Sequence, residues 1–261
     1  MAETIWLGQV ALITGCGSNK GIGYAVARRL GSQGVKLLIT STSERIFQRV
    51  AELKSLGFEV AGFIGDLTDE MQVQLLYQWA MNQFGRIDIL VNNAGMAMQG
   101  HPEPFSLVSD TDLPTWHMSL NRNLTTAFLM TRAVLTAMQA QGYGRIVNVS
   151  STTGTRGTNI GEAAYAAAKA GMVGFTMSLA LESARQGITV NSVAPGWIET
   201  ESSTEEERMA AQYTPMGRAG SASEVAAAIA FLASPEASYI SGELLVVDGA
   251  NCVIENKAPT L

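Results

Sequence analysis

The residues with the clearest chemical potential are Tyr165 and Lys169, which stand four positions apart in a stretch that favours a helix. That spacing places both side chains on one helix face, one turn apart. A phenol with a pKa of about 10 is a poor proton donor, but a neighbouring ammonium stabilises its anion and lowers that pKa. The pair therefore indicates general acid–base chemistry, with Ser151 upstream placed to hold a carbonyl oxygen beside the phenol. The alternative is a tyrosine at the core edge beside a lysine that reaches into solvent.

A second candidate site is the glycine-rich segment 14–23, TGCGSNKGIG, between an expected strand and an expected helix. Glycine permits positive φ in a tight turn, lets backbone amides approach a pyrophosphate and lets the helix start close to the strand. The segment therefore predicts nucleotide binding, although any sharp strand-to-helix turn also favours glycine. The predicted contacts are Gly15, Gly17, Ser18, Lys20, Gly21, Ile22 and Gly23.

The end of the second expected strand bears on which nicotinamide cofactor binds. Dinucleotide sites often carry an acidic residue about 20 positions beyond the glycines, where it accepts from ribose hydroxyls. This strand instead ends in hydroxyl side chains, among them Ser41 and Thr42, and Lys20 lies in the glycine segment. Hydroxyls and an ammonium suit a 2′-phosphate, so we predict NADP(H) rather than NAD(H). Otherwise Lys20 projects into solvent and the Ser/Thr run is a turn.

Polar residues also follow the third and fourth expected strands. In an open parallel sheet, ligands bind at the carboxyl edge where such residues gather. Simple turn chemistry is the alternative, since Asn and Gly are common in loops. The further predicted cofactor contacts at this edge are Asp66, Leu67, Asn93, Ala94 and Gly95.

Short apolar runs rich in Val, Ile and Leu alternate with helical patterns along the chain, which predicts strands alternating with helices. Continuous apolarity within the runs indicates strands buried on both faces, as in a parallel sheet covered by helices. We therefore expect a single-domain, doubly wound α/β fold of the Rossmann kind. The expected strands are 10–14, 35–40, 60–64, 87–92, 145–150, 188–194 and 244–248.

Two segments near the C-terminus have distinct signals. Ser221 and Glu224 form a capping box that predicts the start of the last helix, and Pro235 marks its end. The polar segment 199–212, which contains three consecutive glutamates, is predicted to be either a surface loop or lid, or a solvated helix face.

Composition excludes several classes of protein. The 261 residues are 47% hydrophobic and carry a net charge of −6, without a basic block that could follow a phosphate backbone, so nucleic acid is not expected as a partner. Two cysteines supply neither a disulfide framework nor a four-ligand metal site, and no metal is expected. With no signal peptide, anchor or membrane span expected, a cytoplasmic location is predicted.

These motifs together resemble the short-chain dehydrogenase/reductase family, in its single-domain branch, and are similar to the β-ketoacyl reductase type. The matching pieces follow in order between residues 10 and 250. They are 14–23, Asp66-Leu67, 92–95, Asn123-Leu124, Ser150-Ser151, Tyr165 with Lys169, Asn191 within 190–193, Pro195-Gly196 with Thr200, and Asp248-Gly249.

The resemblance implies a seven-stranded parallel sheet and a catalytic tetrad of Asn123, Ser151, Tyr165 and Lys169. Tyr165 would be the general acid/base, Ser151 would hold the substrate oxygen, and Asn123 would hold a water in the proton relay. Lys169 would bind the nicotinamide ribose and lower the Tyr165 pKa. By the same resemblance, the residues near the nicotinamide are Tyr165, Lys169, Pro195, Gly196, Ile198 and Thr200, and a lid of about 197–215 closes over the substrate.

The sequence departs from the family pattern at two places. Five residues, 16–20, stand before the Gly-Ile-Gly where the family usually has three, so the assignment of Gly17 and Ser18 to the pyrophosphate stays open. The 151–165 interval and the 96–116 loop, at the expected substrate entrance, are also slightly long. The pocket shape therefore cannot be taken from relatives.

The leading functional hypothesis is an NADP(H)-dependent carbonyl reductase or alcohol dehydrogenase, assembled as a homotetramer, that transfers hydride between nicotinamide and a ketone or secondary alcohol. The alternatives are an NAD-dependent alcohol dehydrogenase, a nucleotide-sensing regulator without chemistry, and an enoyl reductase, in which Tyr and Lys usually stand further apart. Residues 138–144 lack Lys and Arg, and the lid is acidic, so we expect a free small or medium ketone rather than one on an acidic carrier.

Overall fold

A seven-stranded, fully parallel sheet forms the centre of the protein in this computed structural model, which describes residue 6, residues 8–95 and residues 102–255. The strand order is β3-β2-β1-β4-β5-β6-β9. The strands are β1 (Val10–Ile13), β2 (Lys36–Ser41), β3 (Val60–Ile64), β4 (Ile89–Asn92), β5 (Gly144–Val149), β6 (Ile188–Pro195) and β9 (Leu244–Val247). The doubly wound fold is confirmed, and each predicted strand begins and ends within two residues of the observed one.

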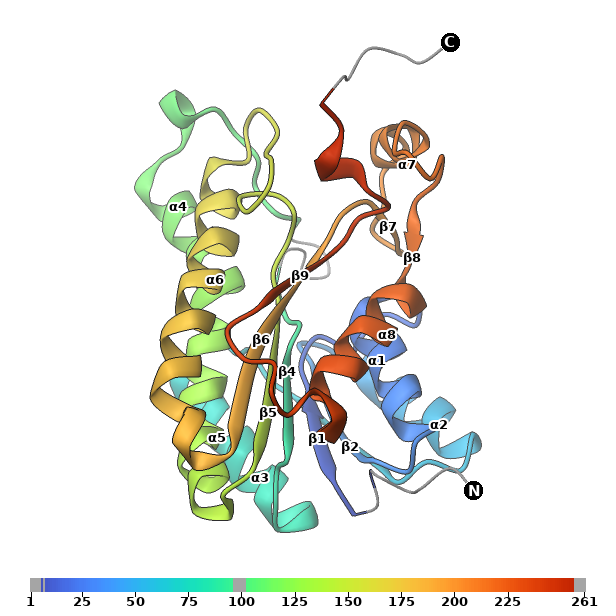
Figure 1. The fold of residues 1–261 in the computed structure, drawn as a ribbon, viewed down its shortest axis with the longest axis vertical. Coiled ribbons are helices and arrows are strands. Elements are labelled where there is room, and N and C mark those ends of the chain that lie inside the picture. Colours follow the sequence, from blue (N-terminus) through green and yellow to red (C-terminus); the bar gives the residue numbers. More distant parts are fainter. Residues whose placement is uncertain (1–5, 7, 96–101, 256–261) are drawn as a thin grey trace.

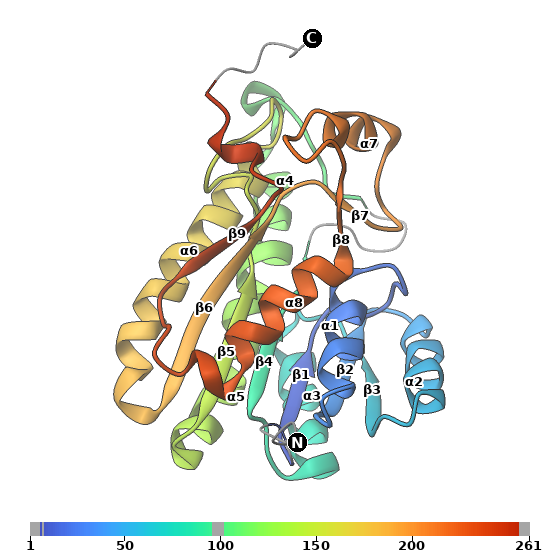
Figure 2. The ribbon, with the colours of Figure 1, turned by 45° about the vertical axis from the view of Figure 1, so that its right-hand side comes forward.

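Helices cover both faces of the sheet (Figures 1 and 2). One face carries α1 (Ile22–Gly31), α2 (Arg45–Ser55) and α8 (Ala222–Ala233), and the other carries α3 (Glu70–Phe84), α5 (Thr126–Gln141) and α6 (Ala163–Ser183). Alternate residues of β1 enter the two cores, because successive strand side chains point to opposite faces. Ala11 and Ile13 pack with α1 and α8, whereas Val10 and Leu12 pack with α3 and α5.

The remaining elements stand mainly at the ends of the sheet layer. They are α4 (Leu113–Leu120), α7 (Glu205–Gln212), β7 (Ile198–Glu199), β8 (Gly220–Ser221), a π-helical turn η2 (Asn121–Thr125), and the 3-10 turns η1 (Val108–Asp110), η3 (Ala184–Gln186), η4 (Pro235–Ala237) and η5 (Asn251–Val253). Helix α7 lies beyond the carboxyl ends of the strands (Figure 1).

The C-terminal predictions can be compared with the observed caps. The Ser221 hydroxyl accepts from the amide of Glu224, and the Glu224 carboxylate accepts from the amide of Ser221, so the predicted capping box is confirmed. The segment 199–212 combines both alternatives: an irregular stretch is followed by α7, which begins at a second capping box of Thr204 and Glu207. The three glutamates fill its first turn, where the helix dipole favours negative charge.

A chain of buried hydrogen bonds fixes α6 against the sheet. Asn92 of β4 donates to Asn148 of β5 at 2.8 Å, and Asn148 donates to Thr176 of α6 at 2.8 Å. The Thr176 hydroxyl also bonds Ser192 of β6 at 2.7 Å. Buried polar groups that lose a partner cost stability, so this network restricts how far α6 can slide.

One helical stretch, Ala163–Gln186, is long and apolar enough to qualify as a membrane span by length and composition. It contains α6, and 44% of its most apolar window is buried inside the fold. Core helices of soluble proteins pass the same test, so this one stretch is weak evidence for a membrane.

Candidate active site

The carboxyl ends of the strands border a cavity of about 700 Å³. Most of the predicted site residues line it, from the β1–α1 turn to the segment that follows β6. They are Gly15, Gly17, Ser18, Gly21, Ile22, Ser41, Thr42, Asp66, Leu67, Asn93, Ala94, Gly95, Ser151, Tyr165, Lys169, Pro195, Gly196, Ile198 and Thr200. Gly23 and Asn123 are buried behind the wall, and Lys20 stands outside it.

The first strand and the fourth are tied together at the cavity floor. The Thr14 hydroxyl accepts from the backbone amides of Asn93 and Ala94 at 2.9 and 2.8 Å. The Asn93 side-chain amide donates to the carbonyls of Thr14 and Gly15 at 2.9 and 3.1 Å. Asn93 therefore acts as a brace for the glycine turn as well as a wall residue.

Two glycines of the turn are required by its geometry. Gly15 has φ of +72°, a left-handed conformation that favours glycine. A Cβ on Gly23 would lie 2.6 Å from the Asn93 side-chain nitrogen and 2.7 Å from the Gly15 carbonyl oxygen. Gly23 thus permits the close approach of α1 to the strand turn, as the sequence predicted.

The start of α1 fits a phosphate group. Gly21 is the N-cap residue and has no side chain to cap the helix, and both Gly21 and Ile22 line the cavity. The first amides of a helix lack intrahelical acceptors and carry partial positive charge, so they bind anions. This open helix start fits the pyrophosphate of a dinucleotide.

Lys20 does not line the cavity beside the strand end with which the sequence analysis grouped it, although its charge lowers the pKa of Glu201, as that of Arg45 does. The lengthened loop closes on itself, with the amide of Lys20 donating to the Ser18 hydroxyl at 3.2 Å, and Lys20 is exposed outside the cavity wall. Arg45 is a cation that does line the cavity, as do Ser41 and Thr42. A Cβ on Gly17 would lie 3.2 Å from Ser41 and 3.7 Å from the Arg45 guanidinium, so these three residues meet.

Sequence reasoning missed Arg45, although a signal was present. It is the first residue of the helix that follows β2, only four positions beyond Ser41. Its guanidinium forms an ion pair of 3.3 Å with Glu201, from the segment on the other side of the cavity. A basic residue in that first turn was therefore a better candidate for a 2′-phosphate than a lysine in an enlarged loop.

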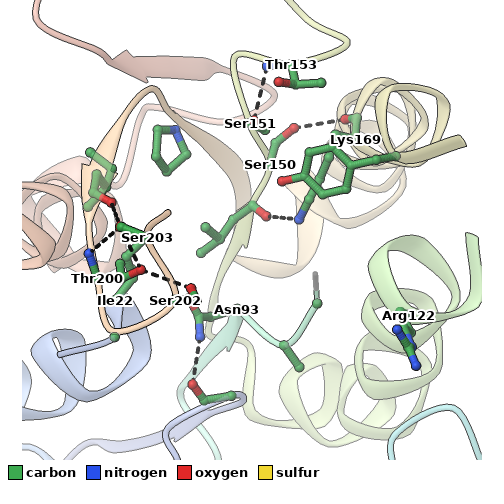
Figure 3. Close-up of a pocket in the computed structure, with 18 of the residues that line it drawn as sticks. Ile22, Asn93, Arg122, Ser150, Ser151, Thr153, Lys169, Thr200, Ser202 and Ser203 are labelled. Atoms are coloured by element: carbon green, nitrogen blue, oxygen red, sulfur yellow. Dashed lines mark hydrogen bonds between the residues drawn. The ribbon is translucent and has the colours of Figure 1, made fainter. Parts of the chain in front are cut away.

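Tyr165, Lys169 and Ser151 come together at the other end of the cavity. Lys169 donates to the Val149 carbonyl at 2.9 Å, and its nitrogen lies 5.6 Å from the centre of the Tyr165 ring. The Ser150 hydroxyl donates to the Lys169 carbonyl at 2.8 Å, which joins the end of β5 to α6. Figure 3 shows Ser151 and Lys169 on one side of the pocket, across from Thr200 and Ser202.

Burial shifts both titratable groups of this pair. Burial raises the pKa of Tyr165, hydrogen bonding with Ser151 lowers it, and the carboxylates Glu103, Glu162 and Glu207 raise it. Burial lowers the pKa of Lys169 to about 8, and the charge of Glu103 opposes that change. At neutral pH the phenol therefore holds its proton and the lysine keeps its charge, which is the arrangement of a proton donor beside a cation. That Lys169 lowers the Tyr165 pKa stays a prediction.

Asn123 lies in the π-helical turn η2, where the amide of Thr126 bonds the carbonyl of Asn121, five residues back. The Asn123 side-chain nitrogen donates to the Ser119 carbonyl at 3.0 Å and to the Glu103 carboxylate at 3.2 Å. A π turn shifts the helical register and often occurs at functional sites. Here it places an asparagine side chain in the bonding position of a helical amide.

Glu103 is the second functional candidate that sequence reasoning missed. It is buried, and it stands between two prolines in a loop, where neither periodicity nor a motif marks it. Of the long 96–116 loop, residues 96–101 lie outside the described residues, whereas Glu103 and its contacts lie within them.

The segment predicted to be a lid is bounded by a pair of short strands, β7 and β8. Strands β7 and β8 pair in parallel, with Ile198 opposite Gly220, so the chain leaves and returns at one place. Between them, the Thr200 amide donates to the Ser203 hydroxyl at 2.9 Å, and Ser203 donates to the Ile198 carbonyl at 3.1 Å. Thr200, Ser202 and Ser203 lie together beside the pocket in Figure 3.

Comparisons with known proteins agree with this geometry. A family model described as enoyl-(acyl carrier protein) reductase matches residues 15–250. The 3-oxoacyl-[acyl-carrier-protein] reductase of Vibrio cholerae is 42% identical over 251 residues, covering 95% of this chain and 98% of the relative. That of Escherichia coli is 42% identical over 246 residues, covering 93% and 96%.

Two solved structures show the same fold. Levodione reductase has a TM-score of 0.87 and 34% identity, covering 95% of this chain and 99% of that one. A variant of actinorhodin polyketide ketoreductase with NADPH has a TM-score of 0.86 and 36% identity, covering 97% and 100%. The family resemblance inferred from the sequence is therefore confirmed.

Tyr165→Phe is expected to preserve the fold and the affinity for cofactor but to reduce kcat about 10² to 10⁴-fold, because it removes only the ionisable oxygen. Steady-state kinetics and circular dichroism check this outcome. Ser151→Ala serves as a companion variant that keeps the phenol and removes its hydrogen-bond partner. Activity of the phenylalanine variant within a few-fold of the wild type would contradict the assignment.

Proposed function

The chain belongs to the short-chain dehydrogenase/reductase family, and on that premise we propose that it is an NADP(H)-dependent ketoreductase. The observation that carries the proposal is the cluster of Tyr165, Lys169 and Ser151 at one end of a cavity whose other end is a glycine turn. A nucleotide-sensing regulator would have no use for a buried phenol beside a buried ammonium. The direction we assign is reduction, because the similar bacterial proteins and the solved levodione reductase are named as reductases.

The cofactor would supply or accept the hydride. Its pyrophosphate would lie at Gly21 and Ile22, and Asp66, Asn93, Ala94 and Gly95 would border it along the strand ends. We assign the 2′-phosphate to Ser41, Thr42 and Arg45, which share one end of the cavity. Pro195, Gly196, Ile198 and Thr200 would border the nicotinamide at the other end.

The protein's own residues then handle the substrate oxygen. Ser151 would donate a hydrogen bond to the carbonyl oxygen, and Tyr165 would deliver the proton that the oxygen takes up. Lys169 would stabilise the phenolate left behind and bind the nicotinamide ribose. Asn123 would hold a water that returns the proton from solvent. We propose that the segment 197–215, moving about the β7–β8 pairing, covers the substrate during this step.

The charge around the entrance favours a free ketone as the substrate. The cavity is lined by Glu162, Glu199, Glu201 and Glu207 and also by Arg45, Arg122, Arg156 and Arg208. Arg208 is paired with Glu199 at 3.1 Å and Arg45 with Glu201 at 3.3 Å. Ion pairing of these two arginines with carboxylates reduces their attraction for an acidic carrier, which favours a free ketone. The second candidate, a 3-oxoacyl group on a carrier protein, is favoured by the names of the bacterial relatives.

We assign the protein to a reducing compartment, the cytoplasm. The sequence holds only two cysteines, Cys16 and Cys252, which supply no disulfide framework, and Cys16 is buried. Burial strongly raises the Cys16 pKa, which makes that thiol unreactive. Cys16 thus serves packing rather than redox chemistry.

The proposed function is tested by NADPH oxidation with matched substrates. Free ketones of small and medium size should give kcat/KM values above those of a 3-oxoacyl group on acyl carrier protein and of a 2-enoyl thioester. The same 3-oxoacyl chain on a small thiol serves as the control for the carrier. A higher value with the carrier-bound group would select the second candidate, and turnover of the enoyl compound alone would refute ketone reduction.

Cofactor selectivity is expected to depend on Arg45 rather than on Lys20. Charge-assisted hydrogen bonds contribute about 1.5 to 3 kcal/mol, so Arg45→Ala should weaken NADPH binding about 10- to 150-fold with little effect on NADH. Lys20→Ala is the matched control and should change both affinities equally. Ser41→Asp should reverse the preference, because a carboxylate repels phosphate and accepts from ribose hydroxyls. Dissociation constants from fluorescence titration decide this, and a wild-type preference for NADH would contradict it.

Exposed apolar side chains on α5 and α6 support the predicted homotetramer. Leu181 is 84% exposed and Met177 is 55% exposed on α6, and Phe128 of α5 stacks edge-on against Phe175 at 6.2 Å. Large exposed apolar residues on adjacent helices suit burial against another copy. We propose that these two helices form the main subunit interface.

Light scattering at micromolar concentration is expected to give the mass of a tetramer. Leu181→Arg should shift that mass toward dimer or monomer, because it places a charge in an apolar interface. Phe47→Arg, at an exposed position on α2 across the sheet, should leave the mass unchanged. A monomeric wild type would refute the assembly.

A further inference from the structure

Glu103 is a buried carboxylate beside the proposed catalytic residues. Only 7% of its surface is exposed, although it belongs to a loop. One carboxylate oxygen accepts from the Ser119 hydroxyl, and the other accepts from the Asn123 side-chain amide at 3.2 Å. Glu103 does not line the cavity, so it acts through the residues in front of it.

A buried charge needs compensation, and Ser119 and Asn123, which bond Glu103, are both neutral. Removing a carboxylate from water costs several kcal/mol unless hydrogen bonds and an opposite charge offset that cost. Lys169 is a buried cation, only 4% exposed, and donates to the neutral carbonyl of Val149. Each of the two buried charges is therefore hydrogen-bonded to neutral groups and gains from the opposite charge of the other.

We propose that Glu103 is a positioning residue of this site, which orients Asn123 and provides the buried countercharge that keeps Lys169 protonated. The inference rests on the proposed ketoreductase function for its catalytic consequence. The orientation follows from the contact with Asn123, whose amide nitrogen is held between Glu103 and the Ser119 carbonyl. That contact turns the Asn123 carbonyl oxygen toward Gly95, where an added Cβ would lie 2.8 Å from it.

The electrostatic part agrees in sign with the proposal. Burial lowers the pKa of Lys169 to about 8, and Glu103 raises it. Without the Glu103 charge, the Lys169 pKa falls further, so the ammonium is lost closer to neutral pH. A neutral amine cannot stabilise the phenolate that forms when Tyr165 gives up its proton. The rate of reduction would therefore fall at mildly alkaline pH.

Other charged groups also lie near this site, and Arg122, Arg156 and Arg208 line the same cavity. Glu162 and Glu207 raise the pKa of Tyr165, as Glu103 also does. Arg132 of α5 is paired with Glu70, and Arg122 of η2 donates to the Pro102 carbonyl at 3.3 Å. His117 of α4 is exposed and borders a shallow pocket outside the active-site cavity. Glu103 is the carboxylate that affects Lys169.

The direct test titrates Lys169 in the protein without cofactor or substrate. The chain has only five lysines, so carbon-13 labelling of lysine gives a spectrum simple enough to follow each one, and Lys169→Arg identifies the signal. In wild type, this signal should titrate near pH 8 and in Glu103→Gln at distinctly lower pH. Glu162→Gln is the matched control, because it removes a carboxylate that acts on Tyr165, and should leave the Lys169 titration in place.

Kinetics then separates the charge from the orientation. Glutamine keeps the shape and an acceptor for Asn123, so Glu103→Gln should retain kcat near pH 6 and lose about tenfold near pH 9 relative to wild type. Glu103→Asp keeps the charge but is shorter, so it should lower kcat at every pH. The pH at which kcat falls on the alkaline side should stay where it is in the wild type. KM should change little in either variant, because Glu103 lies outside the cavity wall.

The outcomes distinguish this inference from the proposed function. An unchanged Lys169 titration in Glu103→Gln refutes the countercharge, whether or not the protein reduces ketones, because the measurement needs no turnover. If Glu103→Gln does not fold, as judged by circular dichroism, Glu103→Asp still tests the orientation. A wild-type kcat in Glu103→Asp refutes that part.

Discussion

The fold depends above all on one topological constraint, the reversal of winding direction at β1. From β1 the chain crosses to β2 and β3 on one side, then returns to place β4, β5 and β6 on the other. The connections that leave β1 and β4 diverge, which opens a crevice at their carboxyl ends where ligands bind. Thr14 and Asn93 close the floor of that crevice with four hydrogen bonds between the two strand ends. The cavity walls are built outward from this joint.

Helix α6, which carries Tyr165 and Lys169, is held by buried hydrogen bonds inside an otherwise aliphatic core. Asn148 links β5 to Thr176 of α6, and two further bonds join Ser150 and Val149 to Lys169. These contacts fix the helix at two levels, at Lys169 and about two turns further on at Thr176. Apolar packing alone would tolerate small slides of α6, whereas buried donors and acceptors lose bonding free energy when they are displaced. These buried hydrogen bonds therefore set the distance between Ser151, at the end of β5, and the phenol of Tyr165.

Much of this arrangement could be predicted from the sequence, because local patterns determine it. Continuous apolar runs located the strands, and a spacing of four located Tyr165 and Lys169 on one helix face. The sequence did not reveal contacts between distant segments. Lys20 was chosen for its place beside the glycines, but loop length decides where that side chain goes, and Arg45 lines the cavity from the next helix. Glu103 is buried because α4 and η2 pack against its loop, and no local sequence pattern predicts that contact.

Burial shifts the pKa values of Tyr165 and Lys169 in opposite directions, and neighbouring charges and hydrogen bonds change the size of each shift. Burial favours the neutral form of each, so it raises the pKa of Tyr165 and lowers that of Lys169. Carboxylates around the phenol raise its pKa further, so the phenol stays protonated but becomes a weaker acid, whereas the hydrogen bond with Ser151 opposes this rise. Oxidation of an alcohol needs the phenolate instead, and so requires either a higher pH or added positive charge near the phenol. Acidic and basic side chains line this cavity together, so the balance of burial, carboxylates and hydrogen bonding at Tyr165 decides how readily the phenol gives up its proton.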